Sequence, residues 1–96
     1  MIRHVATFTF IDEATNAQMN ALDEALHTLP NTIDAISAYS GHRNVGAASN
    51  CDYIVIGDFD DMDRYLEYAD HPDHIAVIEA YVKPIMASVA RIQIEV

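Results

Sequence analysis

Hydrophobic and polar positions alternate along three stretches of the chain, at residues 2–11, 51–59 and 87–96. A period of two sends successive side chains to opposite faces, and β-branched and aromatic residues are frequent here, so each stretch predicts a strand. A weaker alternation over residues 36–45 predicts another strand. Both faces of the first strand carry apolar residues, which is typical of a strand that is covered on both sides.

Residues 15–31 show the period of a helix instead. Thr15 and Gln18 match a capping box, in which each side chain satisfies the other's backbone N–H. An apolar stripe follows at helical spacing, and Pro30 ends it. A short turn of helix is expected over residues 32–36. The stripe consists of Met19, Leu22, Ala25, Leu26 and Leu29.

A second helical region follows the acidic run at residues 58–63. We expect Asp60 to cap this helix, because a carboxylate accepts hydrogen bonds from the free N–H groups of the first turn. Tyr68 borders the stripe that we expect to be buried, and it could reach a pocket. That stripe consists of Met62, Tyr65, Leu66 and Ala69.

Pro72 divides this region, because proline lacks an N–H and fits only the first turn of a helix. We therefore expect a break at residues 70–71 and a new helix from Pro72, with His74 in its first turn. The helix dipole there favours a neutral imidazole, which could act as a general base, while Asp70 and Asp73 favour the charged form. Alternatively Asp70 or His71 only caps the helix and His74 is a surface residue. The expected buried face consists of Ile75, Ile78, Val82 and Ile85.

The order strand, helix, strand, strand, helix pair, strand is the βαββαβ pattern of α+β, ferredoxin-like folds. We expect one domain over residues 1–96, with an antiparallel four-stranded sheet and helices on one face. The other face would be apolar and bare, and pairing of two sheets in a homodimer would cover it. The residues expected on that face include Val5, Thr7, Thr9, Ile11, Ile54 and Ile56.

Charge and composition limit the kinds of molecule that this protein is expected to bind. Fifteen acidic residues against five basic ones give a net charge of −10, so nucleic acid and anionic membrane surfaces are not expected partners. Cys51 is the single cysteine, which excludes an internal disulfide. No apolar run approaches the length of a membrane span, and we expect a cytoplasmic protein. A turn is expected over residues 46–50.

Two parts of the sequence carry side chains that could bind a metal ion. The acidic run at residues 58–63 lacks the glycine and the distal glutamate of a calcium loop. His71 and His74 are spaced to share one helix face, but zinc needs further ligands. We therefore expect no metal and no cofactor.

Four pieces of the chain together resemble the stress-responsive dimeric α/β barrel family, known as Dabb. The most specific is Tyr68-x-x-His71-Pro72-x-His74. The resemblance implies a ferredoxin-like homodimer, a dimeric α/β barrel in which two sheets form the central barrel. In the cyclases of this family it implies catalysis without a cofactor. The other pieces are Ile2-Arg3-His4-Val5, the strand over residues 52–59, and Lys83-Pro84.

Polyketide cyclases of the olivetolic acid cyclase type, within this family, close a poly-β-keto chain by aldol condensation. The resemblance implies that His74 and Tyr68 are catalytic and that His4 lies in the pocket. The resemblance also implies two differences from the cyclases. The cyclases carry a tyrosine at the position near Leu26 and a histidine at the position of Tyr53. The side chains expected to contact a substrate are Tyr53, Ala6, Phe8, Leu26 and His71.

The sequence leaves several functions open. In the first, His74 removes a proton next to a carbonyl, Tyr68 orients it, and His4 binds the developing oxyanion of a small apolar keto or phenolic compound. In the second, the protein is a non-catalytic dimer that binds a small ligand or serves a stress response. A monooxygenase of the same barrel superfamily is a further alternative.

Overall fold

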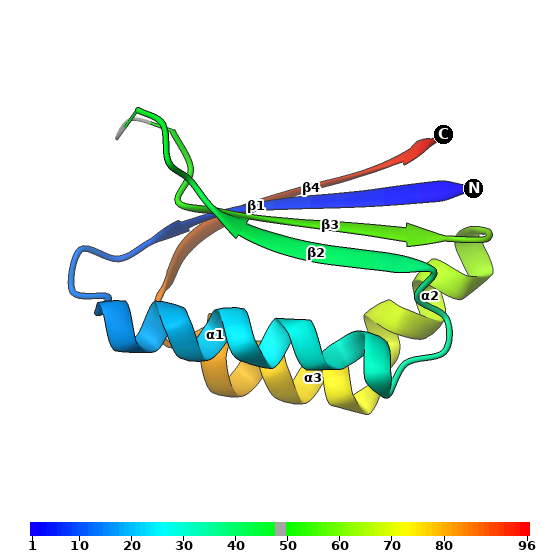
Figure 1. Ribbon diagram of the computed structural model, residues 1–96, viewed down its shortest axis with the longest axis horizontal. Coiled ribbons are helices and arrows are strands. Elements are labelled where there is room, and N and C mark those ends of the chain that lie inside the picture. Colours follow the sequence, from blue (N-terminus) through cyan, green and yellow to red (C-terminus); the bar gives the residue numbers. More distant parts are fainter. Residues whose placement is uncertain (48–49) are drawn as a thin grey trace.

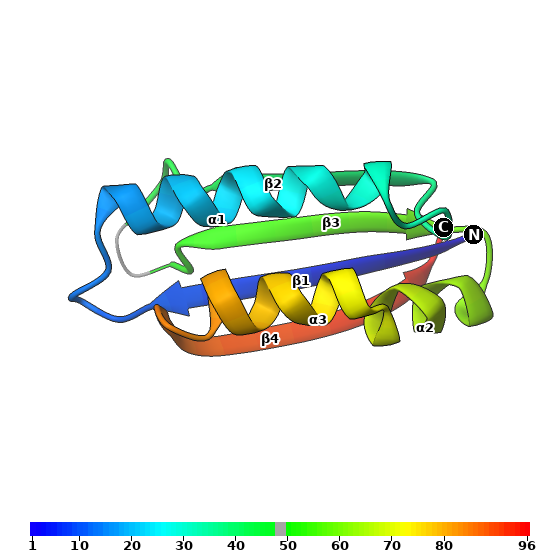
Figure 2. The same ribbon diagram turned by 90° about the horizontal axis from the view of Figure 1, so that it is seen from below.

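The computed structural model describes residues 1–47 and 50–96, and within them a sheet of four strands packs against one layer of helices (Figure 1). All neighbouring strands are antiparallel, in the order β2-β3-β1-β4. Figure 2 shows that α1 and α3 cover the same face of the sheet. The ferredoxin-like α+β prediction is confirmed. The elements are β1 (Ile2–Phe10), α1 (Asn16–Thr28), β2 (Ala38–Arg43), β3 (Tyr53–Phe59), α2 (Met62–Asp70), α3 (Pro72–Val77) and β4 (Met86–Glu95).

β1 lies at the centre of the sheet, where it is hydrogen-bonded to β3 on one edge and to β4 on the other. His4, Ala6 and Phe8 are buried on the face toward the helices, whereas Val5 and Thr7 are half-buried on the opposite face. The alternation in the sequence predicted these faces correctly, because side chains of a strand alternate strictly between the two sides.

The first helix begins and ends as expected. Thr15 and Gln18 form the capping box, and Leu22 and Leu26 are buried against the sheet. A turn of 3₁₀ helix, η1 (Leu29–Asn31), then ends the helical segment at the proline. The short helix expected over residues 32–36 is wrong, since these residues form turns.

The cap and the buried face of α2 differ from the prediction. Asp61, not Asp60, caps the helix by accepting a hydrogen bond from the Arg64 N–H, and Asp60 accepts one from Ser37. Met62 and Leu66 remain 44% and 48% exposed. Tyr65 and Ala69 of the predicted stripe do pack against the core, and Tyr68, which was expected at its border, is the buried residue of α2.

The break before Pro72 is confirmed, and His71 caps α3 with its side chain. A π-helical segment, η2 (Ile78–Val82), continues α3. Val77 and Val82 are buried, whereas Ile75 is largely exposed, contrary to the prediction for it. Val82 and Ile85 are buried as predicted, and Ile78 is half-buried. Ile75 is exposed because Val77 takes the position of α3 that faces the core.

The expected turn over residues 46–50 includes Ala48 and Ser49, which lie outside the described residues. Among the helices that the structure does describe, none has the length and apolar character needed to cross a membrane.

Candidate functional site

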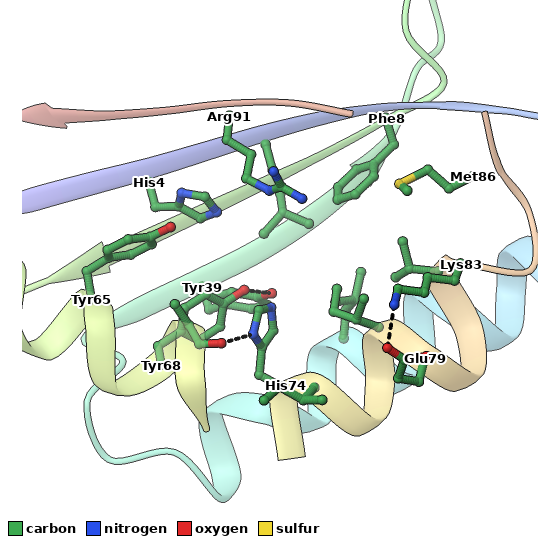
Figure 3. A pocket seen from close by; sticks show the side chains of 17 residues that line it. His4, Phe8, Tyr39, Tyr65, Tyr68, His74, Glu79, Lys83, Met86 and Arg91 are labelled. Carbon is green, nitrogen blue, oxygen red and sulfur yellow. Dashed lines mark hydrogen bonds and ion pairs between the residues drawn. The ribbon is translucent and has the colours of Figure 1, made fainter. Parts of the chain in front are cut away.

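A pocket of about 330 Å³ lies between the helices and the inner face of the sheet (Figure 3). This volume lies at the lower end of the range for small-molecule sites. Its walls come mainly from β1, β4, α2, α3 and η2. The structure brings together here these residues that the sequence analysis selected: His4, Ala6, Phe8, Leu26, Tyr68 and His74.

His74 presents an uncharged imidazole to this pocket. Its Nδ1 lies 3.1 Å from the carbonyl oxygen of Ala69, and because a carbonyl can only accept, Nδ1 must donate. The proton of the neutral ring is thereby fixed on Nδ1, and Nε2 keeps a lone pair. Burial lowers the pKa of His74, although the bond to Ala69 opposes this effect. Near pH 7 the side chain is therefore a base with its acceptor nitrogen available.

His4 has the opposite arrangement of its proton. The amide nitrogen of Gln93 lies 2.9 Å from Nδ1 of His4, and an amide nitrogen can only donate. The proton of the neutral His4 ring is therefore on Nε2. Burial is the main cause that lowers the pKa of His4 to about 4, with smaller contributions from His74 in its protonated form and from the positive charge of Arg91. The side chain is only 4% exposed, so it enters the pocket as a neutral hydrogen-bond donor.

Tyr68 lies between the two histidines. Its ring centroid is 4.2 Å from that of His74 and 6.1 Å from that of His4. The hydroxyl of Tyr68 is 2.8 Å from the hydroxyl of Tyr39 on β2. Burial raises the pKa of Tyr68, and it raises the pKa of Tyr39 to about 12, so both remain neutral phenols. With its hydroxyl bonded to Tyr39, Tyr68 is suited to positioning His74.

Tyr65 completes the aromatic wall beside His4. Their ring centroids are 4.9 Å apart, and the Gln93 amide nitrogen lies 3.3 Å from the Tyr65 hydroxyl oxygen. Gln93 therefore links β4 to both β1 and α2. The contact holds the His4 ring from two sides, which fixes its orientation toward the pocket.

Two of the predicted pocket residues lie elsewhere. Tyr53 is buried under Gly41, where its hydroxyl donates to the carboxylate of Asp23. His71 accepts a hydrogen bond from the Asp73 N–H with Nδ1 and borders a different depression of the surface. The expectation that they line this pocket is therefore wrong, because the cap of α3 turns His71 away and the sheet holds Tyr53 beneath β2.

No group of three or more metal-ligating side chains occurs in residues 1–47 and 50–96. His71 accepts from the Asp73 N–H, His74 donates to the Ala69 carbonyl of α2, and the two side chains line different depressions.

The sequence analysis did not select Tyr39, Gln93 or Arg91 as site residues. Tyr39 is bonded to Tyr68, Gln93 is bonded to His4, and Arg91 lines the pocket. The alternation along β4 does put Arg91 and Gln93 on one face. What the sequence could not supply is the register, which sets Gln93 opposite His4 and Arg91 opposite Ala6.

Comparisons with known proteins agree with this architecture. A family model described as Stress Responsive A/B Barrel Domain matches residues 2–96. A protein of unknown function from Thermobifida fusca YX, described as dimeric and ferredoxin-like, is 35% identical, with a TM-score of 0.90 over 99% of this chain and 90% of that chain.

Two other solved structures show likeness of fold alone. One is a dimeric ferredoxin-like protein of unknown function from Bacteroides fragilis NCTC 9343, 24% identical with a TM-score of 0.89, covering 99% of this chain and 95% of that chain. The other is a hydroxynitrile lyase from Passiflora edulis, 11% identical with a TM-score of 0.85, covering 99% of this chain and 92% of that chain. A search of curated proteins found no match.

Proposed function

Because the chain belongs to the Dabb family of stress-responsive A/B barrel domains, we propose that it is a cofactor-independent enzyme that transfers a proton at the carbon next to a carbonyl group. The substrate class is a small apolar keto or phenolic compound. The observation that carries this proposal is the pair of neutral histidines at one pocket, His74 with a free acceptor nitrogen and His4 with a free donor N–H. Proton abstraction next to a carbonyl needs both a base and a donor for the oxygen.

The proposed reaction begins when Nε2 of His74 takes a proton from the carbon next to the carbonyl. The C–H electron pair becomes the carbon–carbon double bond of an enolate, and the carbonyl electrons move to oxygen. The Nε2–H of His4 donates to that oxygen as its charge develops. The apolar lining of the pocket strengthens this bond, because few water molecules compete for it.

In a substrate with a second carbonyl, the enolate carbon attacks that carbonyl carbon and forms a new carbon–carbon bond. The resulting alkoxide takes the proton back from the His74 imidazolium, so the histidine ends the cycle neutral. This is the aldol chemistry of the polyketide cyclases that the sequence resembles. Tyr68 acts here as a positioning residue, because its ring stacks on His74 while its hydroxyl is bonded to Tyr39.

The proposal includes assembly of two copies through the outer face of the sheet. Ile92 and Ile94 on β4 are exposed there beside the half-buried Val5 and Ile56. An apolar face of this kind favours burial against a second copy. The 35% identical protein from Thermobifida fusca YX, which is described as dimeric, supports the same assembly.

The reaction can be tested by hydrogen–deuterium exchange at the α-carbon of 4-phenylbutan-2-one in D₂O, followed by ¹H NMR. We expect exchange at least tenfold faster than in buffer without protein. A general base contributes about 100-fold or more, so His74→Gln should return exchange to the background rate. The matched control is His42→Gln, since the His42 side chain on β2 is exposed and lies outside this pocket.

Exchange that persists in the folded His74→Gln variant would refute the assignment of the base. If the wild-type protein binds the ketone but gives no exchange, the non-catalytic ligand-binding dimer becomes the better account. Retention of the near-UV circular dichroism spectrum and of the melting temperature shows that a variant has folded.

A further inference from the structure

Arg91 lies on the inner face of β4, opposite Ala6 of β1, and lines the pocket. Figure 3 shows its side chain reaching from the sheet into the space between His4 and Phe8. It therefore comes from the same wall as His4, one inward-facing position further along the paired strands. Diagonal neighbours of this kind are about 7–8 Å apart at Cα.

The guanidinium of Arg91 differs from the other basic groups in its partners. Arg3, Arg64 and Lys83 each form an ion pair with a carboxylate. Arg43 is hydrogen-bonded to Asn16. Among residues 1–47 and 50–96, no side chain forms a hydrogen bond or ion pair with Arg91. Arg91 is exposed to solvent at the pocket, so its guanidinium is hydrated and can exchange that water for an anionic ligand.

Arg91 shares the pocket with both histidines and with Tyr65. Burial is the main reason that the pKa values of His4 and His74 are lowered, and the positive charge of Arg91 acts in the same direction. For Tyr65 the same charge opposes burial, which raises the pKa of that phenol. One cation thus acts on both histidines from the side of the sheet. An anion bound to it would lie within reach of the same two rings.

We propose that Arg91 binds the carboxylate of the ligand, so that the pocket takes an aromatic or keto acid in preference to a neutral ketone. Arginine suits this role because its planar fork donates two parallel hydrogen bonds to a carboxylate. Because His4 and Arg91 are diagonal neighbours at one pocket, the proposed ligand has a second oxygen two carbons from its carboxylate, to accept from the Nε2–H of His4. A 3-oxo acid and a 2-hydroxybenzoate both have this spacing.

This inference adds a substrate class to the proposed function. It rests on that function only in calling the acid a substrate, because an acid can bind without being turned over. The test therefore measures binding alone. The probes are 2-hydroxybenzoate and its neutral analogue 2-hydroxybenzamide, which have nearly the same shape and differ in charge. Their affinities are measured by isothermal titration calorimetry, with ¹⁵N–¹H shift changes to locate the site.

We expect the acid to bind the wild-type protein at least tenfold more tightly than the amide. Arg91→Met should weaken binding of the acid by at least tenfold and change binding of the amide by less than twofold. Arg91→Lys should recover part of the preference, because it restores the charge without the planar fork. The matched control is Arg43→Met, which removes an exposed arginine outside this pocket.

Equal affinity for the two probes, no binding of the acid to the wild-type protein, or an Arg91→Met variant that keeps the preference would overturn the inference. The outcome is separable from that of the proposed function. An acid that binds through Arg91 without any exchange by His74 leaves this inference intact and refutes the reaction. Exchange that depends on His74, found together with equal affinity for the acid and the amide, supports the reaction and refutes this inference.

Discussion

Nδ1 of His4 on β1 accepts a hydrogen bond from the side-chain amide of Gln93 on β4, across a distance of 2.9 Å. This single contact decides which ring nitrogen of His4 carries its proton. An amide nitrogen has no lone pair to offer, so the proton stays on Nε2, on the side that can serve a substrate oxygen.

Gln93→Glu should reverse this arrangement. A carboxylate can only accept, so Nδ1 of His4 would become the donor and Nε2 would lose its proton in the neutral ring. We expect the ¹⁵N shifts of the His4 ring to show the other tautomer, the pKa of His4 to rise, and α-carbon exchange to fall at least tenfold. An unchanged tautomer in a folded Gln93→Glu protein would contradict the assignment.

Stability should depend on pH through His4. Its pKa is about 4 in the folded protein, against an ordinary value of 6.5, so between these values the unfolded chain binds a proton that the folded chain does not. The free energy of unfolding should therefore fall as the pH is lowered from 6.5 toward 4. Urea unfolding at intervals of pH measures the slope. The slope gives the number of protons taken up on unfolding. His4→Gln should lower this number by up to about one, while His42→Gln should leave it unchanged.

The hydroxyls of Tyr39 and Tyr68 should be coupled in stability. They bond to each other at 2.8 Å, and Tyr68 is only 2% exposed. Either single change to Phe leaves the other buried hydroxyl without its partner, which costs about 1–3 kcal/mol. The double variant should lose less than the sum of the single losses, since no unpaired hydroxyl remains. Strict additivity in urea unfolding would rule out the coupling, and Tyr81→Phe on the exposed surface is the control.

Dimerisation through the outer sheet face should fail when that face is charged. Ile92 is 58% exposed on β4, so Ile92→Glu adds a carboxylate there without disturbing the protomer core. Burying an unpaired charge in an interface costs several kcal/mol, so we expect the dimer dissociation constant to rise by about 100-fold or more. Light scattering after size-exclusion chromatography measures the mass. Leu66→Glu on α2 is the control, and a dimer that survives Ile92→Glu would place the interface elsewhere.

Several features of this protein follow from short-range patterns in the sequence. The alternation over residues 2–11 predicted which face of β1 is buried, because a strand has only two faces. Thr15 with Gln18 and His71 with Pro72 predicted where helices begin, because caps and prolines act within a few residues. The order of these elements was enough to predict the ferredoxin-like fold.

The pocket itself depended on contacts between distant segments. The sequence selected His4, Tyr68 and His74 through a resemblance, but only the fold brings β1, α2 and α3 together around one cavity. Gln93 and Arg91 became site residues only through the register between β1 and β4, where a slip of one residue would turn both side chains to the other face.

The buried face of α2 also depended on contacts with distant segments. The helical period predicted burial of Met62 and Leu66 as strongly as burial of Tyr65, because all three lie at helical spacing with largely apolar side chains. The choice depended on the sheet beneath, where Tyr68 meets Tyr39 of β2 and stacks on His74 of α3. The sequence by itself determined the elements and their order through local backbone and capping preferences. Tertiary structure decided which side chains meet, because that depends on register and helix rotation, which local preferences do not encode.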